Sequence, residues 1–277
     1  MKEDKKQLAS KSIKPTTVLV TGANGLLGRT IQKYKDDYPK INFLFCSSKE
    51  LDITIKESIK KNFKKNKPDY CINCAAYTNV EKAEKEPEKA FLVNAEGAKN
   101  LAEVCKESGT VLIHISTDYV FDGEKRTPYT VKDIPNPINE YGKSKLQGEK
   151  YIQQILERYF IIRTSWLYSK EFEKNFYLTI LEKAKRGEEL RITDAQIGCP
   201  TDTENLTKYI LELINIPLPL EGKGENYGIH HFCDKKQMTW YGFAISILEK
   251  NKIDNMILIN DNSYKTIAKR PIYSVLE

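Results

Sequence analysis

Three glycines, Gly22, Gly25 and Gly28, follow a short apolar run at residues 18–21 and open a helical segment at residues 26–35. After a strand, glycines in these places permit a tight turn, a close approach of the backbone to a pyrophosphate, and close packing of helix on strand. The spacing is G-x-x-G-x-x-G rather than the commoner G-x-G-x-x-G, and glycine turns also form for purely structural reasons. The segment predicts a strand–turn–helix unit with a dinucleotide site at the turn.

The rest of the first 165 residues alternates between apolar strand-like runs and helical segments. We expect further strands at residues 43–46, 68–73, 111–116 and 160–164, and helices at residues 55–65, 87–105 and 141 to about 158. Such alternation predicts an α/β fold with a doubly wound parallel sheet of the Rossmann type, covered by helices on both faces.

Beyond Trp166 the alternation becomes looser. Helices at residues 175–186, 205–213 and 240–250 are joined by connections rich in proline and glycine, with short strands near residues 190–192 and 229–232. We therefore expect three parts: a disordered basic tail at residues 1–16, an NAD(P)-binding domain at residues 17–165, and residues 166–277 as mainly a substrate-binding lobe, interleaved with the end of the sheet.

Composition excludes several classes of function. The 44 basic and 38 acidic residues give a net charge of +6, but the lysines are spread along helices without a basic-aromatic stripe, so nucleic-acid binding is not expected. The mean hydropathy of −0.53 and the lack of a long apolar run argue against a membrane span and a signal peptide. We expect a cytoplasmic protein whose mild positive field attracts an anionic small substrate.

The six cysteines, at positions 46, 71, 74, 105, 199 and 233, are expected to be free thiols. Most fall in apolar strand-like runs, where free cysteine behaves as a small hydrophobic residue. Cys71 and Cys74 form a C-x-x-C within a predicted strand, where residues three apart face opposite ways. This argues against a redox or zinc motif, and no other metal-ligand spacing is present, including at His230 and His231.

Tyr141 and Lys145 stand four residues apart in a predicted helix, so their side chains share one face. A nearby ammonium favours the ionised form of a phenol. Such a phenol exchanges a proton with a substrate hydroxyl or carbonyl near neutral pH. Together with the dinucleotide turn, the pair predicts hydride transfer at a C–OH/C=O centre.

The end of the second strand bears on the choice of cofactor. An Asp or Glu there binds a ribose 2′-hydroxyl and repels a 2′-phosphate, but this chain has Ser47, Ser48 and Lys49 after the strand. We therefore expect NADPH, with NADH tolerated. Asp52 and Ile53 follow slightly downstream, and a helix cap is the alternative role for Asp52.

Ser116, Thr117 and Asp118 lie at the carboxyl end of the fourth strand, where ligands bind in open α/β sheets. Thr117 is placed to donate a hydrogen bond to the carbonyl that Tyr141 protonates, although such a cluster also forms turns. His114, within the same strand, is expected to be a core residue. Trp166, after the fifth strand, either stacks on a flat ring of the substrate or packs against the lobe.

Several blocks of the chain resemble one enzyme family. They are residues 21–28 (TGANGLLG), 68–84 (PDYCINCAAYTNVEKAE), 93–95 (VNA), 115–123 (ISTDYVFDG), 137–145 (PINEYGKSK), 163–166 (RTSW) and 194–201 (DAQIGCPT). These blocks are similar to the extended short-chain dehydrogenase/reductases, and within them to the dTDP-4-dehydrorhamnose reductase family. The blocks at 115–123 and 196–201 are specific, whereas the glycines alone are generic.

The resemblance implies roles for individual residues. Tyr141 is the expected proton donor, Lys145 its modulator and a ribose ligand, and Thr117 the third catalytic residue. The expected cofactor contacts, besides the three glycines and Ser47, are Asn24, Leu26, Leu27, Asp52, Ile53, Ala75, Ala76, Tyr77, Asn94 and Ser116. The expected substrate contacts, besides Thr117, are Thr78, Val80, Asp118 and Trp166. The implied reaction moves a hydride from NAD(P)H to C4 of dTDP-4-dehydro-L-rhamnose.

The chain departs from the family pattern in two places. It stops at Glu277, where members of the family continue through a further helix, so we expect a shortened C-terminus. Some members dimerise through a metal bound by a carboxylate after the third glycine, but here Arg29 and Thr30 follow Gly28. A metal-bridged dimer is therefore not expected, and monomer and homodimer both remain open.

Three other functions compete with this interpretation. A dehydratase needs a second carboxylate after Thr-Asp on the fourth strand, but this chain has Tyr119 there. An epimerase, or a reductase of another nucleotide-deoxysugar, is compatible with the same motifs. A non-catalytic NAD(P)-binding regulatory subunit is the third, and the presence of Thr117, Tyr141 and Lys145 argues against it.

Overall fold

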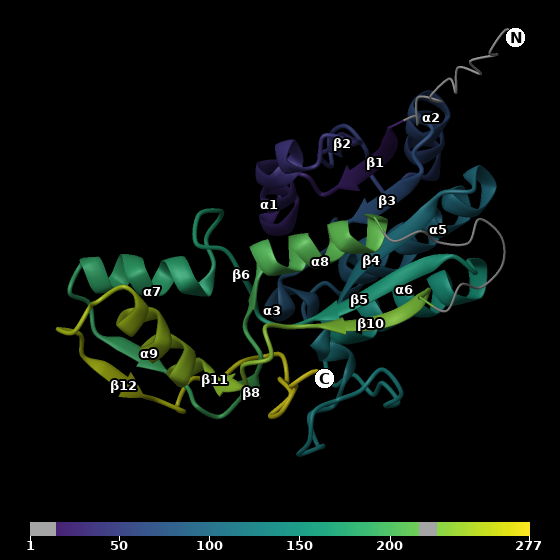
Figure 1. Cartoon of the computed structure of the whole chain (residues 1–277). Coiled ribbons are helices and arrows are strands. Elements are labelled where there is room, and N and C mark those ends of the chain that lie inside the picture. The colour runs from purple at the N-terminus through teal and green to yellow at the C-terminus, as the bar shows by residue number, and fades with distance from the viewer. Residues whose placement is uncertain (1–14, 216–225) are drawn as a thin grey trace, which may run out of the picture.

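The computed structural model describes residues 15–215 and 226–277, and Figure 1 shows a parallel sheet with a smaller lobe to one side. Within the described residues the sheet has the order β10-β5-β4-β3-β1-β2, and every pairing in it is parallel. Its strands are β1 (Thr16–Thr21), β2 (Ile41–Cys46), β3 (Tyr70–Asn73), β4 (Val111–Thr117), β5 (Tyr159–Thr164) and β10 (Gly228–Phe232). The predicted doubly wound sheet is confirmed.

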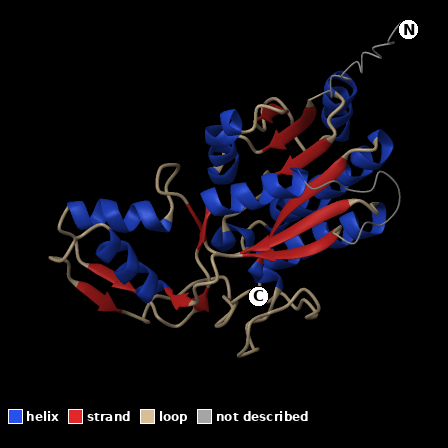
Figure 2. Cartoon of the chain, in the orientation of Figure 1, coloured by secondary structure: helices blue, strands red, loops and turns tan. Residues whose placement is uncertain are grey.

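Helices cover both faces of this sheet (Figure 2). They are α1 (Leu26–Tyr34), α2 (Lys56–Asn66), α3 (Val80–Ala83), α4 (Pro87–Phe91), α5 (Gly97–Ser108), α6 (Glu140–Ile155) and α8 (Thr203–Asn215). Successive strand residues supply the two layers: Val18 and Val20 pack with α1 and α8, whereas Leu19 packs with α2 and α5. Because both faces are buried, these strands are almost wholly apolar, as parallel sheets require.

The helix predicted over residues 87–105 is interrupted. Between α4 and α5 the chain forms a π-helical turn, η2 (Leu92–Glu96). Single π turns concentrate at functional sites because they redirect one side chain. Here Asn94 turns into the protein and is 1% exposed. The prediction of one continuous helix was wrong at this turn, since the periodicity of the sequence carries no mark of it.

The smaller lobe is formed by segments beyond Trp166. It contains α7 (Phe176–Lys185), α9 (Trp240–Lys250), and the short strands β7 (Leu190–Ile192), β8 (Ile197–Gly198), β11 (Met238–Thr239) and β12 (Leu258–Asn260). A separate apolar cluster that includes Tyr177, Ile180, Phe243 and Ile247 holds α7 and α9 together. Helix α8 and strand β10 come from the same half of the sequence but lie with the sheet.

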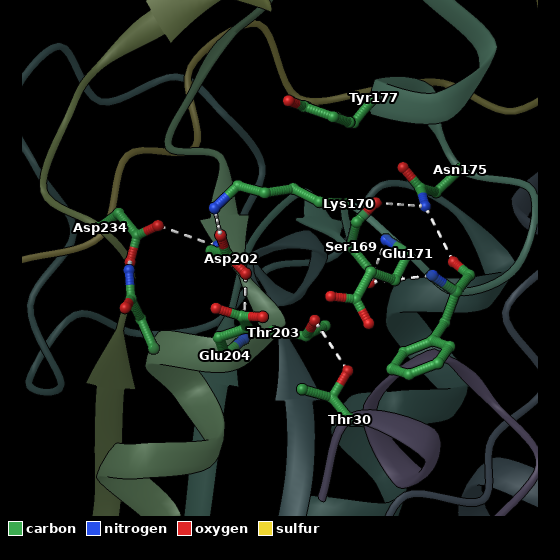
Figure 3. A network of polar contacts seen from close by, with 12 residues as sticks. Thr30, Ser169, Lys170, Glu171, Asn175, Tyr177, Asp202, Thr203, Glu204 and Asp234 are labelled. Carbon is green, nitrogen blue, oxygen red and sulfur yellow. Dashed lines mark hydrogen bonds and ion pairs between the residues drawn. The ribbon is translucent and has the colours of Figure 1, made fainter. Parts of the chain in front are cut away.

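A polar network ties the lobe to the sheet where the chain crosses between them (Figure 3). The crossing strands β6 (Leu167–Tyr168) and β9 (Thr201–Asp202) pair in parallel. Lys170 forms an ion pair with Asp202 at 2.7 Å, and Asp234 accepts a hydrogen bond from the Asp202 backbone N–H at 2.9 Å. The Thr30 and Thr203 hydroxyls meet at 3.0 Å, which joins α1 to the start of α8. We call this network the junction.

The cysteines in the structure are free thiols. Cys71 packs in the layer with α2 and α5, and Cys74 lies against the opposite layer, so the C-x-x-C pair is split between two faces as predicted. No helix in residues 15–215 or 226–277 is long and apolar enough to span a membrane. The predicted tail, residues 1–16, lies outside the described residues except for its last two, and Thr16 begins β1.

Candidate active site

The glycine turn after β1 lies at the switch point of the sheet, between β1 and β3. Gly22 has a φ of +63°, and a Cβ on it would lie 2.6 Å from the Ala75 backbone nitrogen, so only glycine fits. Gly28 is equally constrained by the Gly22 carbonyl at 2.5 Å. By contrast, a Cβ on Gly25 would approach only the Gly22 carbonyl, at 3.3 Å. The space over Gly25 is therefore available to a ligand that approaches the backbone.

Helix α1 begins at this turn with features suited to an anion. Its N-cap is Gly25, which makes no side-chain cap, and its first turn has no acidic residue. Backbone N–H groups at such a helix start attract phosphate oxygens. Asn24 is exposed beside the turn, whereas the Leu27 side chain is in the core. In this segment, the backbone at the turn is thus available to a ligand, whereas the Leu27 side chain holds α1 on the sheet.

The end of β2 carries an acid that the sequence prediction left out of this site. One carboxylate oxygen of Glu50 accepts hydrogen bonds from the Ser47 backbone N–H at 2.8 Å and from the Ser47 hydroxyl at 2.7 Å. Asp52 accepts from the Thr54 backbone and hydroxyl in a local turn, and it does not cap α2, whose N-cap is Ile55 without a side-chain hydrogen bond. The Ile53 side chain is buried against Gly97. The sequence prediction missed Glu50 because it did not foresee the reverse turn that brings Glu50 back to Ser47.

The loop after β3 is held by Asn94 from the π turn. The Asn94 amide accepts from the Tyr77 backbone N–H at 2.8 Å and donates to the Tyr77 carbonyl at 3.0 Å and the Ser144 hydroxyl at 3.0 Å. Its hydrogen-bonding groups are thus engaged by protein, and it joins the loop to α6. The Tyr77 hydroxyl donates to Glu86, outside the cleft. Ala75 and Ala76, also predicted to line the cofactor, precede Tyr77 in this half-buried loop.

A cleft of about 280 Å³ opens above the carboxyl ends of β4 and β5. It is lined by Thr78, Val80, Ser116, Thr117, Asp118, Tyr119, Tyr141, Thr164, Ser165, Trp166, Leu167 and Trp240. The structure therefore brings together the predicted substrate contacts and two of the three predicted catalytic residues. Thr164, a residue that the sequence prediction missed, has a buried hydroxyl with no hydrogen-bond partner in the described residues.

Tyr141 sits in the first turn of α6, on the wall of the cleft. The helix starts at this point because the Asn139 side chain accepts a hydrogen bond from the Gly142 backbone N–H at 2.7 Å. Gly142 lets the helix approach the strand end, since a Cβ on it would lie 2.1 Å from the Tyr119 carbonyl. Burial raises the pKa of the Tyr141 hydroxyl well above its usual range, while the Thr117 side chain lowers it in part.

Lys145 lies one turn further along α6 and is 2% exposed. Its ammonium donates to the Ile115 carbonyl at 2.6 Å, and its Nζ lies 3.3 Å from His114 Nε2. Burial lowers the pKa of Lys145 to about 8, against the opposing effect of the Glu149 carboxylate. The structure differs here from the expectation that Lys145 acidifies Tyr141, because Lys145 is not among the groups that shift the tyrosine pKa.

Thr117 and Asp118 form a connected pair at the end of β4. The Thr117 hydroxyl donates to Asp118 Oδ1 at 3.0 Å and accepts from the Tyr119 backbone N–H. Asp118 Oδ2 accepts from the Ser274 hydroxyl at 2.6 Å, so the C-terminal segment is fastened to the cleft. Burial raises the pKa of Asp118 to about 7, although these hydrogen bonds lower it. Ser274 lies 156 residues away, so the residues around Asp118 could not predict this contact.

Beneath the cleft is a buried ion pair that the sequence prediction missed. Arg163 on β5 donates to both carboxylate oxygens of Glu149 on α6, with its Nη2 at 2.7 Å from Oε2. Ser116, predicted as a cofactor contact, donates its hydroxyl to the same carboxylate. One signal was available, because Tyr141, Lys145 and Glu149 recur every four residues and so line one face of α6.

Trp166 is packed into the lobe. Its ring stacks on Trp240 at a centroid distance of 3.6 Å and an interplanar angle of 6°. A Cβ on Gly198 would lie 2.4 Å from the Trp166 ring, so glycine is required there. Of the two roles left open for Trp166, the structure displays the contact with the lobe. Trp240, which the sequence prediction missed, lines the cleft beside it.

Trp240 also lines a second cavity, of about 640 Å³, in the lobe. Arg191, Tyr264 and Arg270 are among its other residues. Arg270 donates to Glu81 at 2.9 Å and to the Tyr119 hydroxyl at 3.3 Å. We call this cavity the lobe pocket. It adjoins the cleft through Trp240. Its lining includes Arg191 and Arg270, whereas the described residues that line the cleft include no lysine or arginine.

Sequence comparisons agree with the motifs. A family model described as the RmlD substrate binding domain matches residues 16–277. A protein from Aggregatibacter actinomycetemcomitans named dTDP-4-dehydrorhamnose reductase is 37% identical over 94% of this chain and 90% of its own length. The spore coat polysaccharide biosynthesis protein SpsK of Bacillus subtilis is also 37% identical, over 94% of this chain and 89% of its own.

Solved structures give the same result. A dTDP-4-dehydrorhamnose reductase from Clostridium acetobutylicum is similar with a TM-score of 0.86 and 38% identity, covering 95% of this chain and 90% of that one. Another, from Bacillus anthracis in complex with NADP, has a TM-score of 0.86, 35% identity and the same coverage. A Thermus thermophilus UDP-glucose 4-epimerase, at 18% identity and a TM-score of 0.79 over 95% of this chain and 90% of its own, shares the fold. The resemblance found in the motifs is confirmed, and the chain belongs to the dTDP-4-dehydrorhamnose reductase family.

Proposed function

We propose that this protein is an NAD(P)H-dependent oxidoreductase that reduces the C4 ketone of dTDP-4-dehydro-L-rhamnose to the alcohol of dTDP-L-rhamnose. The observation that carries the proposal is the cleft, in which Thr117 and Tyr141 lie together at the carboxyl ends of the strands. Family membership supports the same reaction class, because its members are named for it. The close relative solved with NADP supports NADPH as the preferred cofactor.

The residues of the β1–α1 turn fit such a cofactor. Gly22 and Gly28 hold the turn against β3, and Gly25 leaves the backbone open beside an uncapped helix start. We assign the pyrophosphate to this helix start and the adenosine end to the region of Ser47 and Glu50. When bound, the nicotinamide dinucleotide supplies the hydride.

Tyr141 donates its proton to the ketone oxygen as the C4 centre is reduced. Because burial raises its pKa, the hydroxyl is fully protonated at neutral pH and is ready to act as an acid. When the ketone is bound, the Thr117 hydroxyl turns from Asp118 and donates its hydrogen bond to the same oxygen. Lys145 binds a cofactor ribose, which is the other role that the resemblance implies for it. Thr164, whose hydroxyl is unpaired within the described residues, is a further candidate for binding a sugar hydroxyl.

The nucleotide end of the substrate fits the lobe pocket. Trp240 offers an aromatic face, and Tyr264, with 78% of its surface exposed, offers another for a pyrimidine base. Arg191 and Arg270 supply positive charge for a diphosphate. We therefore assign residues 166–277, apart from α8 and β10, to substrate binding, with Trp240 between the sugar and the nucleotide.

The test is an assay of nicotinamide absorbance with NADPH and dTDP-4-dehydro-L-rhamnose. We expect turnover by the wild-type protein and a fall in kcat of about 10²- to 10⁴-fold in Tyr141→Phe, the usual contribution of a general acid. Tyr151→Phe is the matched control, because Tyr151 lies on the same helix but bonds to Glu96 away from the cleft. Unchanged turnover in Tyr141→Phe would contradict the proton-donor assignment.

The competing functions give different results in this assay. An epimerase or a reductase of another nucleotide-deoxysugar would act on a different member of a substrate panel, identified by NMR of the product. A regulatory subunit would bind NADPH without oxidising it with any sugar in the panel.

A further inference from the structure

A chain of buried hydrogen bonds leads from the glycine turn to Lys145. The Thr21 hydroxyl donates to Asn73 Oδ1 at 2.6 Å, and Asn73 Nδ2 lies 3.0 Å from His114 Nδ1. His114 Nε2 in turn lies 3.3 Å from Lys145 Nζ. All four side chains are at most 2% exposed. His114 was expected to be a core residue, yet it bridges the cofactor turn and the Lys145 amine.

The hydrogen bonds fix where the imidazole carries its proton. Asn73 Oδ1 is the acceptor for the Thr21 hydroxyl and for the Ala75 backbone N–H, at 3.2 Å, which sets the orientation of the amide. Asn73 Nδ2 must then donate to His114 Nδ1. Burial holds the pKa of His114 well below its usual range, so the ring is neutral. A neutral imidazole that accepts at Nδ1 carries its proton on Nε2.

The Nε2–H group of His114 consequently faces the Lys145 amine. A neutral amine accepts this hydrogen bond while it donates to the Ile115 carbonyl, but an ammonium presents a donor to a donor. Resting on the function proposed above, we propose that His114, held by Asn73, is a positioning residue that disfavours the protonated form of Lys145. Lys145 is thereby able to exchange a proton near neutral pH instead of remaining a permanent cation.

Other ionisable groups near Lys145 do not supply this effect. Glu149, on the same helix, favours the protonated amine, although its carboxylate is shared with Arg163 of β5 and Ser116. The Cys74 thiol, after β3, is neutral because burial raises its pKa. Tyr141 and Asp118 line the cleft, whereas Lys145 is not among its lining residues. His114 is thus the neighbour on β4 whose donor opposes the charge.

The first test reads the tautomer directly and is independent of any sugar substrate. The chain has three histidines, so a long-range ¹H–¹⁵N spectrum of the full protein is simple to assign, with His114→Asn identifying its signals. We expect the Nε2–H tautomer for His114, and conversion to Nδ1–H in Asn73→Asp, where an acceptor replaces the donor. An Nδ1–H tautomer in the wild-type protein would overturn the proposal.

The second test uses two variants that keep different halves of the imidazole. Gln at position 114 keeps an N–H near the Nε2 position, whereas Asn keeps a polar group only near Nδ1. We measure NADPH binding by fluorescence across pH 6–10. The change in binding at high pH, the alkaline limb of the profile, is assigned to Lys145 by its absence in Lys145→Met. We expect the limb to move up by about one pH unit, a tenfold gain in proton affinity, in His114→Asn, and to stay in place in His114→Gln.

If the alkaline limb lies at the same pH in the wild-type protein and in both variants, His114 only fills the core. If His114→Asn fails to fold, the same shift measured in His114→Leu, which keeps no N–H group and adds no charge, decides the question. Cofactor binding without sugar turnover would contradict the proposed function while leaving this result interpretable. The pH profile of kcat/KM, measured where turnover exists, must move in the same direction.

Discussion

The cleft and the lobe pocket are adjacent, yet they are built in opposite ways. Lys145, Glu149 and Arg163, which support the cleft, are almost fully buried, and each is hydrogen-bonded to a neighbouring element. In the lobe pocket, Tyr264 is 78% exposed, and Arg191 pairs with Glu189 and Asp261.

This difference follows from the elements that carry the two sites. The cleft lies on long strands and on α6, whose positions are over-determined by two layers of core packing. The lobe pocket lies on two-stranded pairs and connecting segments with a small core of their own. Groups on rigid elements hold the geometry that proton transfer needs, whereas recognition tolerates adjustment. Mutations should therefore affect stability at the cleft and substrate affinity at the lobe pocket.

The largest effect is expected from Arg163→Met. It leaves the Glu149 carboxylate buried without its cation and removes the guanidinium that lies 5.2 Å above the Phe121 ring. We expect the free energy of unfolding to fall by about 3–5 kcal/mol, the usual cost of breaking a buried pair, measured by urea denaturation. Adding Glu149→Gln should recover part of the loss, because the unpaired charge is removed.

Lys170→Met at the junction is the comparison for this variant. Lys170 is half exposed, and its partner Asp202 keeps a hydrogen bond from the Glu204 backbone N–H. We expect a smaller loss, of about 1–2 kcal/mol, because the Asp202 carboxylate is buried but Lys170 remains half in solvent. Equal losses in the two variants would break the contrast between the cleft and the more exposed parts of the molecule.

A second effect of burial is expected in Asp118→Asn. The folded pKa of Asp118 is about 7, above its usual 3.8, so the charged form is disfavoured in the folded state. The resulting cost is absent at low pH, grows by about 1.4 kcal/mol per unit as pH rises towards 7, and is constant above 7. The wild-type protein should lose stability relative to Asp118→Asn between pH 5 and 7. Parallel melting temperatures across this range would contradict the burial of the charge.

Local patterns were sufficient to predict the parts of the molecule that depend on short segments. Strand–helix alternation predicts the parallel sheet, since each unit is recognisable within about 30 residues. Helical spacing places Tyr141 and Lys145 on one face, as observed in α6. The constraint on Gly28 is equally local, because a Cβ there would meet Gly22 and Ala23 of the turn itself.

Contacts between distant segments were not predictable in this way. Trp240 lies on Trp166, and Ser274 bonds to Asp118, without any sign in the local sequence of either partner. The π turn at Asn94 is invisible to periodicity because one inserted residue leaves the flanking helices unchanged. Lys145 was expected to act on Tyr141, but the Ile115 carbonyl and His114, both on β4, determine where its amine lies.

The lobe pocket is tested by Arg270→Met, in which the charge assigned to the diphosphate is lost. We expect KM for the nucleotide-sugar to rise about tenfold, with kcat little changed, because one charge-assisted contact is removed. Arg186→Ala, at the C-terminal cap of α7 and 63% exposed at its side chain, is the control and should leave KM unchanged.

Arg270 also binds Glu81, so a second variant separates binding from anchoring. Glu81→Gln weakens the 2.9 Å ion pair but keeps the arginine. If both variants raise KM equally, Arg270 acts by holding the loop after β3 and the pocket assignment is wrong. If only Arg270→Met raises KM, the cation itself meets the substrate, as the open structure of the pocket implies.

The smallest effect is expected at the exposed rim beyond β2, in the choice between NADPH and NADH. The Glu50 carboxylate occupies the Ser47 N–H and hydroxyl, the groups best placed to bind a 2′-phosphate, and adds a negative charge beside them. Glu50→Gln should therefore raise kcat/KM for NADPH relative to NADH by about three- to tenfold, or roughly 1 kcal/mol, since an exposed charge is screened by solvent. Glu57→Gln, on the exposed face of α2, is the matched control. If the ratio moves towards NADH instead, Glu50 helps to bind the cofactor by positioning Ser47 and does not repel it. The rim would then resemble the cleft, where hydrogen bonds within the protein hold the side chains in place, more than the exposed lobe pocket.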